Sequence, residues 1–231
     1  MKRTMTAALM LALAAPASAA ERSYTVTDFD RIQVEGPFNV VVKTGKAPSA
    51  RAAGTNEAVE RVSIEVQGRT LKVRPNRSAW GGYPGKASGP AAIELTTREL
   101  RGASVTGSGS LSIDKAKAMR FDLALSGSGQ LSVGRLDADN LIVGLAGSGK
   151  MTLGGKAKGL KATVQGSGDF DGAKLTVEDA QIRSDTSGAV ALTASRTSNI
   201  VASGTGDTTV AGKSACTVKA LGSGRVRCGQ D

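Results

Sequence analysis

Residues 105–113 read Val-Thr-Gly-Ser-Gly-Ser-Leu-Ser-Ile, with apolar side chains at alternate positions on both sides of a Gly-Ser-Gly triplet. The triplet returns through the second half of the chain, five times as Gly-Ser-Gly and twice as the variants Thr-Ser-Gly and Gly-Thr-Gly. The closing glycines of the seven copies are Gly109, Gly129, Gly149, Gly168, Gly188, Gly206 and Gly224. They lie 20, 20, 19, 20, 18 and 18 residues apart. A self-similarity of nearly constant period predicts a repeat architecture.

Apolar and polar side chains alternate on either side of every triplet. The positions two and four residues after the closing glycine hold Leu111, Ile113, Leu131, Val133, Met151, Leu153, Phe170, Gly172, Val190, Leu192, Thr208, Val210, Val226 and Cys228. Before the triplets, the alternation places on the inner side Leu123, Leu125, Val143, Leu145, Val164, Ile182, Ile200 and Val218. A period of two indicates half-buried strands, and none of these windows fits the 3.6-residue period of a helix.

One repeat of strand, glycine bend and strand describes one coil of a β-solenoid. A single coil cannot bury its own apolar side, whereas coils stacked about 4.8 Å apart share a continuous core and a parallel sheet. The glycines allow bend conformations that are closed to other residues. The hydroxyls between them are expected to form a hydrogen-bonded ladder, and they belong to Ser108, Ser128, Ser148, Ser167, Ser187, Thr205 and Ser223. We therefore predict an all-β fold, a right-handed parallel β-helix with coils of 18–20 residues bent at Gly-Ser-Gly, whose hand follows the crossover rule.

The chain begins with a segment typical of a signal peptide, residues 1–20. Lys2 and Arg3 precede an apolar run that is too short for a permanent membrane span, and small residues at 17–19 suit a signal peptidase. No second apolar run is long enough to cross a membrane. We therefore expect an exported mature chain without a membrane span.

The mature chain is expected to form one continuous domain. Residues 21–99 supply the N-terminal coils of the β-helix, with one helical turn near 56–62 and a Gly/Pro-rich loop at 74–90. Residues 100–231 supply the Gly-Ser-Gly repeat coils.

Composition excludes several classes of function. The chain of 231 residues has 30 Lys and Arg against 20 Asp and Glu, a net charge of +10, no histidine, two cysteines and 3% aromatic residues. The lack of histidine excludes Ser-His-Asp and Cys-His nucleophilic sites and histidine-ligated metals or haem. Two cysteines cannot hold a four-thiolate site. We therefore expect no catalytic residues, no metal and no cofactor, and the few aromatic residues argue against a nucleic-acid partner.

The two cysteines, Cys216 and Cys228, flank the last Gly-Ser-Gly and occupy inward-facing positions of the repeat. An exported protein matures in an oxidising compartment, where such a pair favours a disulfide. We predict that this disulfide closes the final coil and staples an end that would otherwise expose unpaired backbone groups.

Candidate ligand-binding residues fall into two groups. Basic residues between the glycine-centred strands are expected to align in a positive stripe facing an anionic glycan, lipopolysaccharide or, least favoured, nucleic acid. They are Lys115, Lys117, Arg135, Lys156, Lys158 and Lys174. The second group is Trp80 and Tyr83 in the 74–90 loop, whose rings suit stacking on sugars or docking on an envelope protein. Each group has a structural alternative, the stripe as a solubilising edge and the rings as a lid on the solenoid.

Three carboxylates raise the alternative of an enzyme. Asp169, Asp171 and Asp207 are expected on one outward face, as in β-helices that cleave acidic polysaccharides. A separation of two coils, about 9–10 Å, is wide even for an inverting glycosidase pair. Residues 144–151 nearly match a phosphate-binding loop, but Met151 replaces the required Ser or Thr and no helix follows. We interpret both features as ordinary repeat positions.

Several segments together resemble the head GIN domain family of auto-transporter adhesins. They are Phe-Asp-Arg-Ile-Gln-Val-Glu-Gly at 29–36, the alternating strand at 38–42, Leu-Lys-Val at 71–73, Ile-Glu-Leu at 93–95 and Val-Thr-Gly-Ser-Gly at 105–109. The resemblance covers about residues 24–228. It implies a right-handed β-helix in an exported bacterial protein, and it carries no catalytic residues to transfer.

These observations favour an exported, non-enzymatic cell-envelope β-helix of adhesin-like type that binds glycan or another envelope component. The alternatives are a polysaccharide-active lyase or hydrolase and a purely structural envelope protein. The expected location is the periplasm, the medium or the cell surface, and the residues leave the oligomeric state open.

Overall fold

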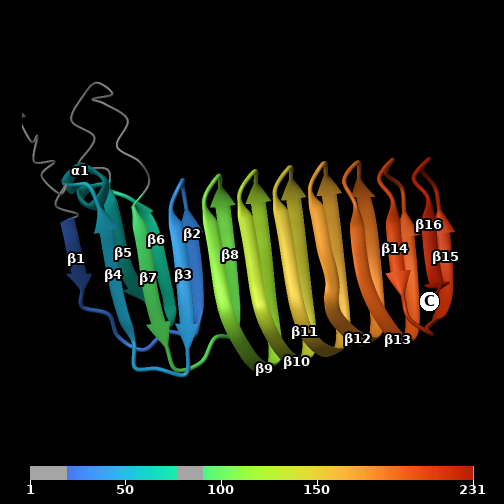
Figure 1. The fold of residues 1–231 in the computed structure, drawn as a ribbon, viewed down its shortest axis with the longest axis horizontal. Helices are drawn as coiled ribbons and strands as arrows, with labels where there is room; N and C mark the ends of the chain where they lie inside the picture. The colour runs from blue at the N-terminus through green and yellow to red at the C-terminus, as the bar shows by residue number, and fades with distance from the viewer. Residues whose placement is uncertain (1–19, 77–90, 231) are drawn as a thin grey trace, which may run out of the picture.

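The computed structural model describes residues 20–76 and 91–230, and it shows strands stacked side by side along one axis (Figure 1). The described strands form one sixteen-stranded hydrogen-bonded sheet. The strands are β1 Ala20–Tyr24, β2 Arg31–Glu35, β3 Asn39–Thr44, β4 Ser49–Gly54, β5 Val62–Gln67, β6 Thr70–Pro75, β7 Ala92–Thr97, β8 Gly102–Gly107, β9 Ser110–Gly127, β10 Gln130–Gly147, β11 Lys150–Gly166, β12 Asp169–Thr186, β13 Val190–Ala202, β14 Thr208–Ala211, β15 Ala215–Ala220 and β16 Val226–Gln230. The predicted β-solenoid is confirmed.

The Gly-Ser-Gly coils stack in parallel register. Strands β9 to β12 each run through a whole coil, so one strand contributes to both walls of the solenoid. Leu111 pairs with Leu131, Leu131 with Met151, and Met151 with Phe170. Like side chains therefore lie above one another along the axis, as the repeat predicts.

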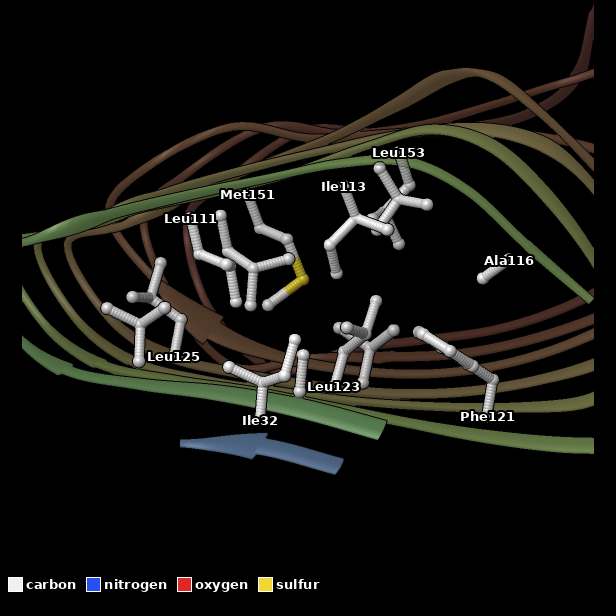
Figure 2. Close-up of a cluster of buried hydrophobic side chains, with 14 of the residues drawn as sticks. Ile32, Leu111, Ile113, Ala116, Phe121, Leu123, Leu125, Met151 and Leu153 are labelled. Carbon is white, nitrogen blue, oxygen red and sulfur yellow. The ribbon is translucent and has the colours of Figure 1, made fainter. Parts of the chain in front are cut away.

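The core fills the space between the two walls (Figure 2). Leu111 and Ile113 enter from one wall, Leu123 and Leu125 from the other, and Phe121 lies near the bend that joins them. These five side chains are at most 3% exposed. Burying one such side chain contributes about 1.5–3 kcal/mol, so a column of them stabilises each coil through its neighbours.

The glycines of the triplet are required for two different reasons. The first glycine has a left-handed backbone, as in Gly127 with φ +113°. The closing glycine is required by close packing, because a Cβ on Gly129 would lie 2.3 Å from the carbonyl oxygen of Gly109 on the previous coil. Coil-to-coil hydrogen bonds here come from the backbone, for example from the N–H of Ser128 to Gly107 O at 3.1 Å.

The predicted hydroxyl ladder is wrong for the described residues. The hydroxyl-bearing residue between the glycines is exposed in every copy, and no hydrogen bond joins these hydroxyls from coil to coil in the described part of the chain. Backbone hydrogen bonds already join successive coils at the bend. The hydroxyls are not needed for this contact and face water.

The N-terminal end departs from the simple stack of parallel coils. β1 pairs antiparallel with β4, β4 pairs antiparallel with β7, and β5 and β6 form an antiparallel pair. The predicted helical turn is present as α1 (Asn56–Glu60), whose N-cap residue Thr55 accepts a hydrogen bond from the N–H of Ala58 at 3.2 Å. The reversed strands and α1 close this end of the core (Figure 1).

The C-terminal end carries the predicted disulfide but not the predicted burial. Cys216 and Cys228 are bonded, with their Cα atoms 6.2 Å apart. Cys216 is exposed and Cys228 is half-buried, although both occupy inward positions of the repeat. Val218 was expected inside and is 45% exposed. The reason is that no further coil among the described residues covers the inner side of β15 and β16.

Candidate functional site

A surface groove of about 450 Å³ lies where the first long coils bend from one wall to the other. We call it the cationic groove, and it is lined by Thr44, Gly45, Arg98, Glu99, Leu100, Lys115, Ala116, Lys117, Arg135 and Asp137. The buried side chains of Leu100 and Ala116 belong to the core and form its floor. The β3–β4 connection, the segment between β7 and β8, and the bends of β9 and β10 therefore meet at one place.

Asp114 fixes the bend that presents the lysines of the groove. One of its carboxylate oxygens accepts the backbone N–H of Thr44 at 3.0 Å and that of Lys115 at 2.6 Å. The hydroxyl of Thr44 donates to the carbonyl oxygen of Lys115 at 2.9 Å. The Asp114 carboxylate thus ties the end of β3 to β9 through backbone groups. Lys115 Nζ has no ion-pair partner among the described residues.

The carboxylates that line the groove are engaged by cations outside it. Asp137 faces Lys156 at 3.7 Å, and Glu99 contacts Arg69 at 3.6 Å and Arg101 at 3.1 Å. In the described part of the chain Lys115, Lys117 and Arg135 form no ion pair. Three basic side chains therefore lie along one short groove without an ion pair of their own.

The predicted basic stripe is divided by the register of the coils. β10 has one residue more than β11 between Val133 and Leu136, and this shift places Lys156 opposite Asp137. Lys158 contacts Asp139 at 2.7 Å, and this hydrogen bond raises the pKa of Lys158. Both lysines therefore belong to a charge-alternating ladder rather than to a positive surface.

Lys174 lies apart from the other members of the stripe. It pairs in register with Gly154, which separates it from Arg135 by one coil without a side chain. It forms no ion pair among the described residues, but it does not line the cationic groove. The structure thus brings together Lys115, Lys117 and Arg135 and leaves the other three predicted cations outside the groove.

The ladder continues toward the C-terminus with a carboxylate held by two donors. Arg196 forms a two-pronged ion pair with Asp179, with Nε 2.9 Å from Oδ1, and the hydroxyl of Thr197 donates to the same oxygen at 2.6 Å. The hydrogen bonds from Arg196 and then Thr197 lower the pKa of Asp179. Arg196 and Asp179 are therefore paired with each other, so neither adds an unpaired charge to the surface.

The carboxylates considered for catalysis are occupied by the backbone. Asp169 accepts the N–H of Ala189 at 2.8 Å, and Asp207 accepts the N–H of Arg225 at 3.0 Å. Asp171 accepts the N–H of Ala173 at 3.2 Å. Each bond stabilises a turn or a step between coils, which agrees with their interpretation as repeat positions. No three Asp, Glu or Cys side chains in the described segments are grouped to hold a metal ion.

Some residues of the site were not predicted and some predicted residues cannot be placed. Arg98 and Asp114 were missed, because nothing in the repeat pattern signals that the β7–β8 connection packs on the bend of β9. The only local signal for Asp114 is its position directly before Lys115 at a bend, together with Thr44 at the end of the neighbouring strand β3. Trp80 and Tyr83 lie outside the described residues.

No described helix is both long and apolar enough to cross a membrane.

The fold places the protein in the class of parallel β-solenoids with glycine-bent coils. Within that class, the chain belongs to the family described as "Putative auto-transporter adhesin, head GIN domain", whose sequence model matches residues 28–214. This confirms the family resemblance found in the sequence. No curated protein shows significant similarity to the chain.

Solved structures of low sequence identity share the fold. A putative adhesin from Bacteroides fragilis NCTC 9343 has a TM-score of 0.81 at 20% identity, over 91% of this chain and 96% of that one. A putative lipid binding protein from Parabacteroides distasonis ATCC 8503 has a TM-score of 0.70 at 24% identity, over 90% and 96% of the two chains. A putative adhesin from the same organism has a TM-score of 0.68 at 20% identity, over 92% and 97%.

Proposed function

We propose that the protein is an exported, non-enzymatic, adhesin-like component of the cell envelope that binds anionic glycan in the cationic groove. The observation that carries the proposal is that Lys115, Lys117 and Arg135 line the groove without an ion pair among the described residues, beside carboxylates already paired elsewhere. Clustered charges of one sign raise the local concentration of an oppositely charged ligand. The family membership and the names of the structural neighbours agree with a binding role.

The proposal of export is supported by the signal-peptide pattern of residues 1–20 and by the disulfide, since disulfides persist in oxidising compartments. The domain is proposed to be continuous from residue 21 to residue 231. A non-enzymatic role is supported by the backbone hydrogen bonds that occupy Asp169 and Asp207.

Glycan is favoured over lipid by the character of the described surface. An acyl chain requires a contiguous apolar surface, whereas the exposed large apolar residues among those described are only Val41, Met119, Val218 and Leu221, and none of them lines the cationic groove. The cationic groove instead offers charge above a narrow apolar floor, which suits a sugar bearing carboxylate or sulfate.

The test compares the binding of dextran sulfate and of uncharged dextran to the purified mature chain at low and high salt. We expect binding of dextran sulfate alone, weakened by salt because the contact is electrostatic. The triple variant Lys115→Glu, Lys117→Glu, Arg135→Glu is expected to abolish it. The control is Lys161→Glu, an exposed lysine on the wall away from the groove. Equal binding of dextran sulfate by the triple variant and the control would refute the proposal that the cationic groove is the binding site.

Trp80 and Tyr83 are proposed to add a stacking contact to the same ligand. The double variant Trp80→Ala, Tyr83→Ala is expected to weaken binding at both salt concentrations equally, because ring stacking on a sugar is not screened by ions. An unchanged affinity would assign these rings a structural role.

A further inference from the structure

The last coil contributes two strands, β15 and β16, and each has one unpaired edge among the described residues. β15 pairs in unbroken parallel register with β13, from Ala215 opposite Thr197 to Ala220 opposite Ala202. No strand among the described residues pairs with its other edge. In Figure 1 this edge lies at the opposite end of the molecule from β1, β4 and α1. An unpaired edge presents a row of N–H and C=O groups that can accept another strand.

The inner side of β15 shows what a further strand would bury. Val218 lies in register with Ile200, and Ile200 with Ile182. The side chains of Ile182 and Ile200 are 3% and 0% exposed, whereas Val218 is 45% exposed and the nearby Leu221 is 63% exposed. The position is buried wherever a following coil is present, so one added strand would complete the core at Val218.

The outer side of the same coil is basic. It bears Lys213, Lys219, Arg225 and Arg227, and only Arg225 has an ion-pair partner among the described residues, Asp207 at 3.8 Å. Lys219 follows Val218 in β15, so strand alternation places it on the opposite, outer side. A strand added to β15 would therefore meet an apolar side chain on one face and a positive charge on the other.

Charge argues against a second copy of this chain as the added strand. A twofold antiparallel pairing of terminal coils would gather Lys219, Arg225 and Arg227 of both molecules at one interface. Like charges on directly opposed strands are destabilising. These cations thus oppose edge-to-edge self-association and favour an acidic segment.

We propose that the outer edge of β15 is a docking site for an extended segment of a partner protein in which acidic side chains alternate with apolar ones. Strand addition provides affinity through main-chain hydrogen bonds and specificity through alternate side chains. The apolar residues of the segment cover Val218 and Leu221, and its acidic residues face Lys219. This site is separate from the cationic groove.

The experiment uses the disulfide-bonded mature chain and two synthetic peptides. One alternates Glu or Asp with Val, and the other carries Lys in place of every acid. We expect the acidic peptide to bind the wild-type protein and to slow amide hydrogen exchange of residues 215–220. Lys219→Glu is expected to weaken binding of the acidic peptide about tenfold and to strengthen binding of the basic one. The matched control, Lys161→Glu, is expected to bind both as the wild type does.

The proposal is overturned if the acidic peptide gives no protection at 215–220, or if Lys219→Glu leaves both affinities unchanged. It is also overturned if the wild-type chain sediments as a dimer that Val218→Asp dissociates, because the occupant of the edge is then a second copy. The triple groove variant separates the two proposals, since it is expected to lose dextran sulfate and to keep the acidic peptide.

Discussion

The backbone N–H of Ala189 donates to a carboxylate oxygen of Asp169, 2.8 Å away on the preceding coil. In the regular coils the equivalent N–H donates to the carbonyl of the closing glycine, as Lys150 N does to Gly129 O at 3.0 Å. At the irregular step the carbonyl of Gly168 accepts the hydroxyl of Thr186 instead, at 3.1 Å. The Asp169 side chain therefore replaces a backbone acceptor where the triplet changes from Gly-Ser-Gly to Thr-Ser-Gly.

The first prediction is that Asp169 stabilises the stack of coils. Asp169→Ala is expected to lower the free energy of unfolding by about 1 kcal/mol, because the N–H of Ala189 loses its acceptor at an exposed site. Asp169→Asn keeps an oxygen at this position and is expected to cost less. Denaturant unfolding measures both, with Lys150→Ala as the control in the same outward row of the previous coil. An equally large loss of unfolding free energy in Lys150→Ala would contradict a specific role of Asp169 in stabilising the stack.

The second prediction separates glycines required by packing from a glycine that is not. Gly129→Ala would place a Cβ 2.3 Å from the carbonyl oxygen of Gly109, which neighbouring backbone cannot avoid without moving. We expect it to destabilise the protein by about 1–3 kcal/mol. Gly144→Ala meets its nearest atom at 3.9 Å, with no positive φ, and is expected to be neutral or slightly stabilising. Thermal unfolding of the two variants checks this order, and equal effects would refute it.

The repeat made most of the fold predictable because side chains two residues apart repeat their inward direction over many coils. The alignment of Leu111, Leu131 and Met151 therefore follows from the sequence alone. The reversed direction of β4 could not, since Ser49–Gly54 is rich in alanine and its partner β7 lies some forty residues later. Local periodicity carries no information on the direction of so distant a pairing.

The candidate site was only partly predictable for a related reason. The positions of Lys115 and Arg135 follow from their equal distance from the closing glycine. The pairing of Lys156 does not, because a one-residue irregularity between β10 and β11 decides which side chain of the previous coil it faces. A bulge of this kind changes the neighbour of every following residue in the bend, and with it the sign of the nearest charge.

The third prediction concerns the disulfide. Since Cys216 is exposed and Cys228 only half-buried, the double variant Cys216→Ser, Cys228→Ser loses little packing. It loses the covalent link between two residues 12 positions apart in the chain. We expect the free energy of unfolding to fall by about 2–4 kcal/mol. Hydrogen exchange is expected to accelerate in β15 and β16 and to stay unchanged in β9 to β11. Reduction of the wild-type protein is the control and should give the same pattern. Acceleration throughout the solenoid would show that the bond stabilises more than the last coil.

The fourth prediction follows from the lowered pKa of Asp179, which Arg196 and Thr197 hold by hydrogen bonds. A carboxylate whose folded pKa lies below its unfolded value of about 3.9 stabilises the fold above that pH. The contribution disappears as the pH falls through the folded pKa. Asp179→Asn is therefore expected to melt below the wild type at neutral pH, and the difference in Tm should shrink below about pH 4.

Asp185→Asn provides the comparison for this pH profile. Asp185 lies on the same strand, is exposed, and has no side-chain hydrogen bond or ion pair among the described residues. The Tm of Asp185→Asn is expected to equal that of the wild type at every pH from neutral to acidic. If Asp179→Asn and the wild type instead differ by a constant amount down to about pH 2, proton linkage at Asp179 is refuted. The ion pair with Arg196 would then stabilise the two coils through packing alone.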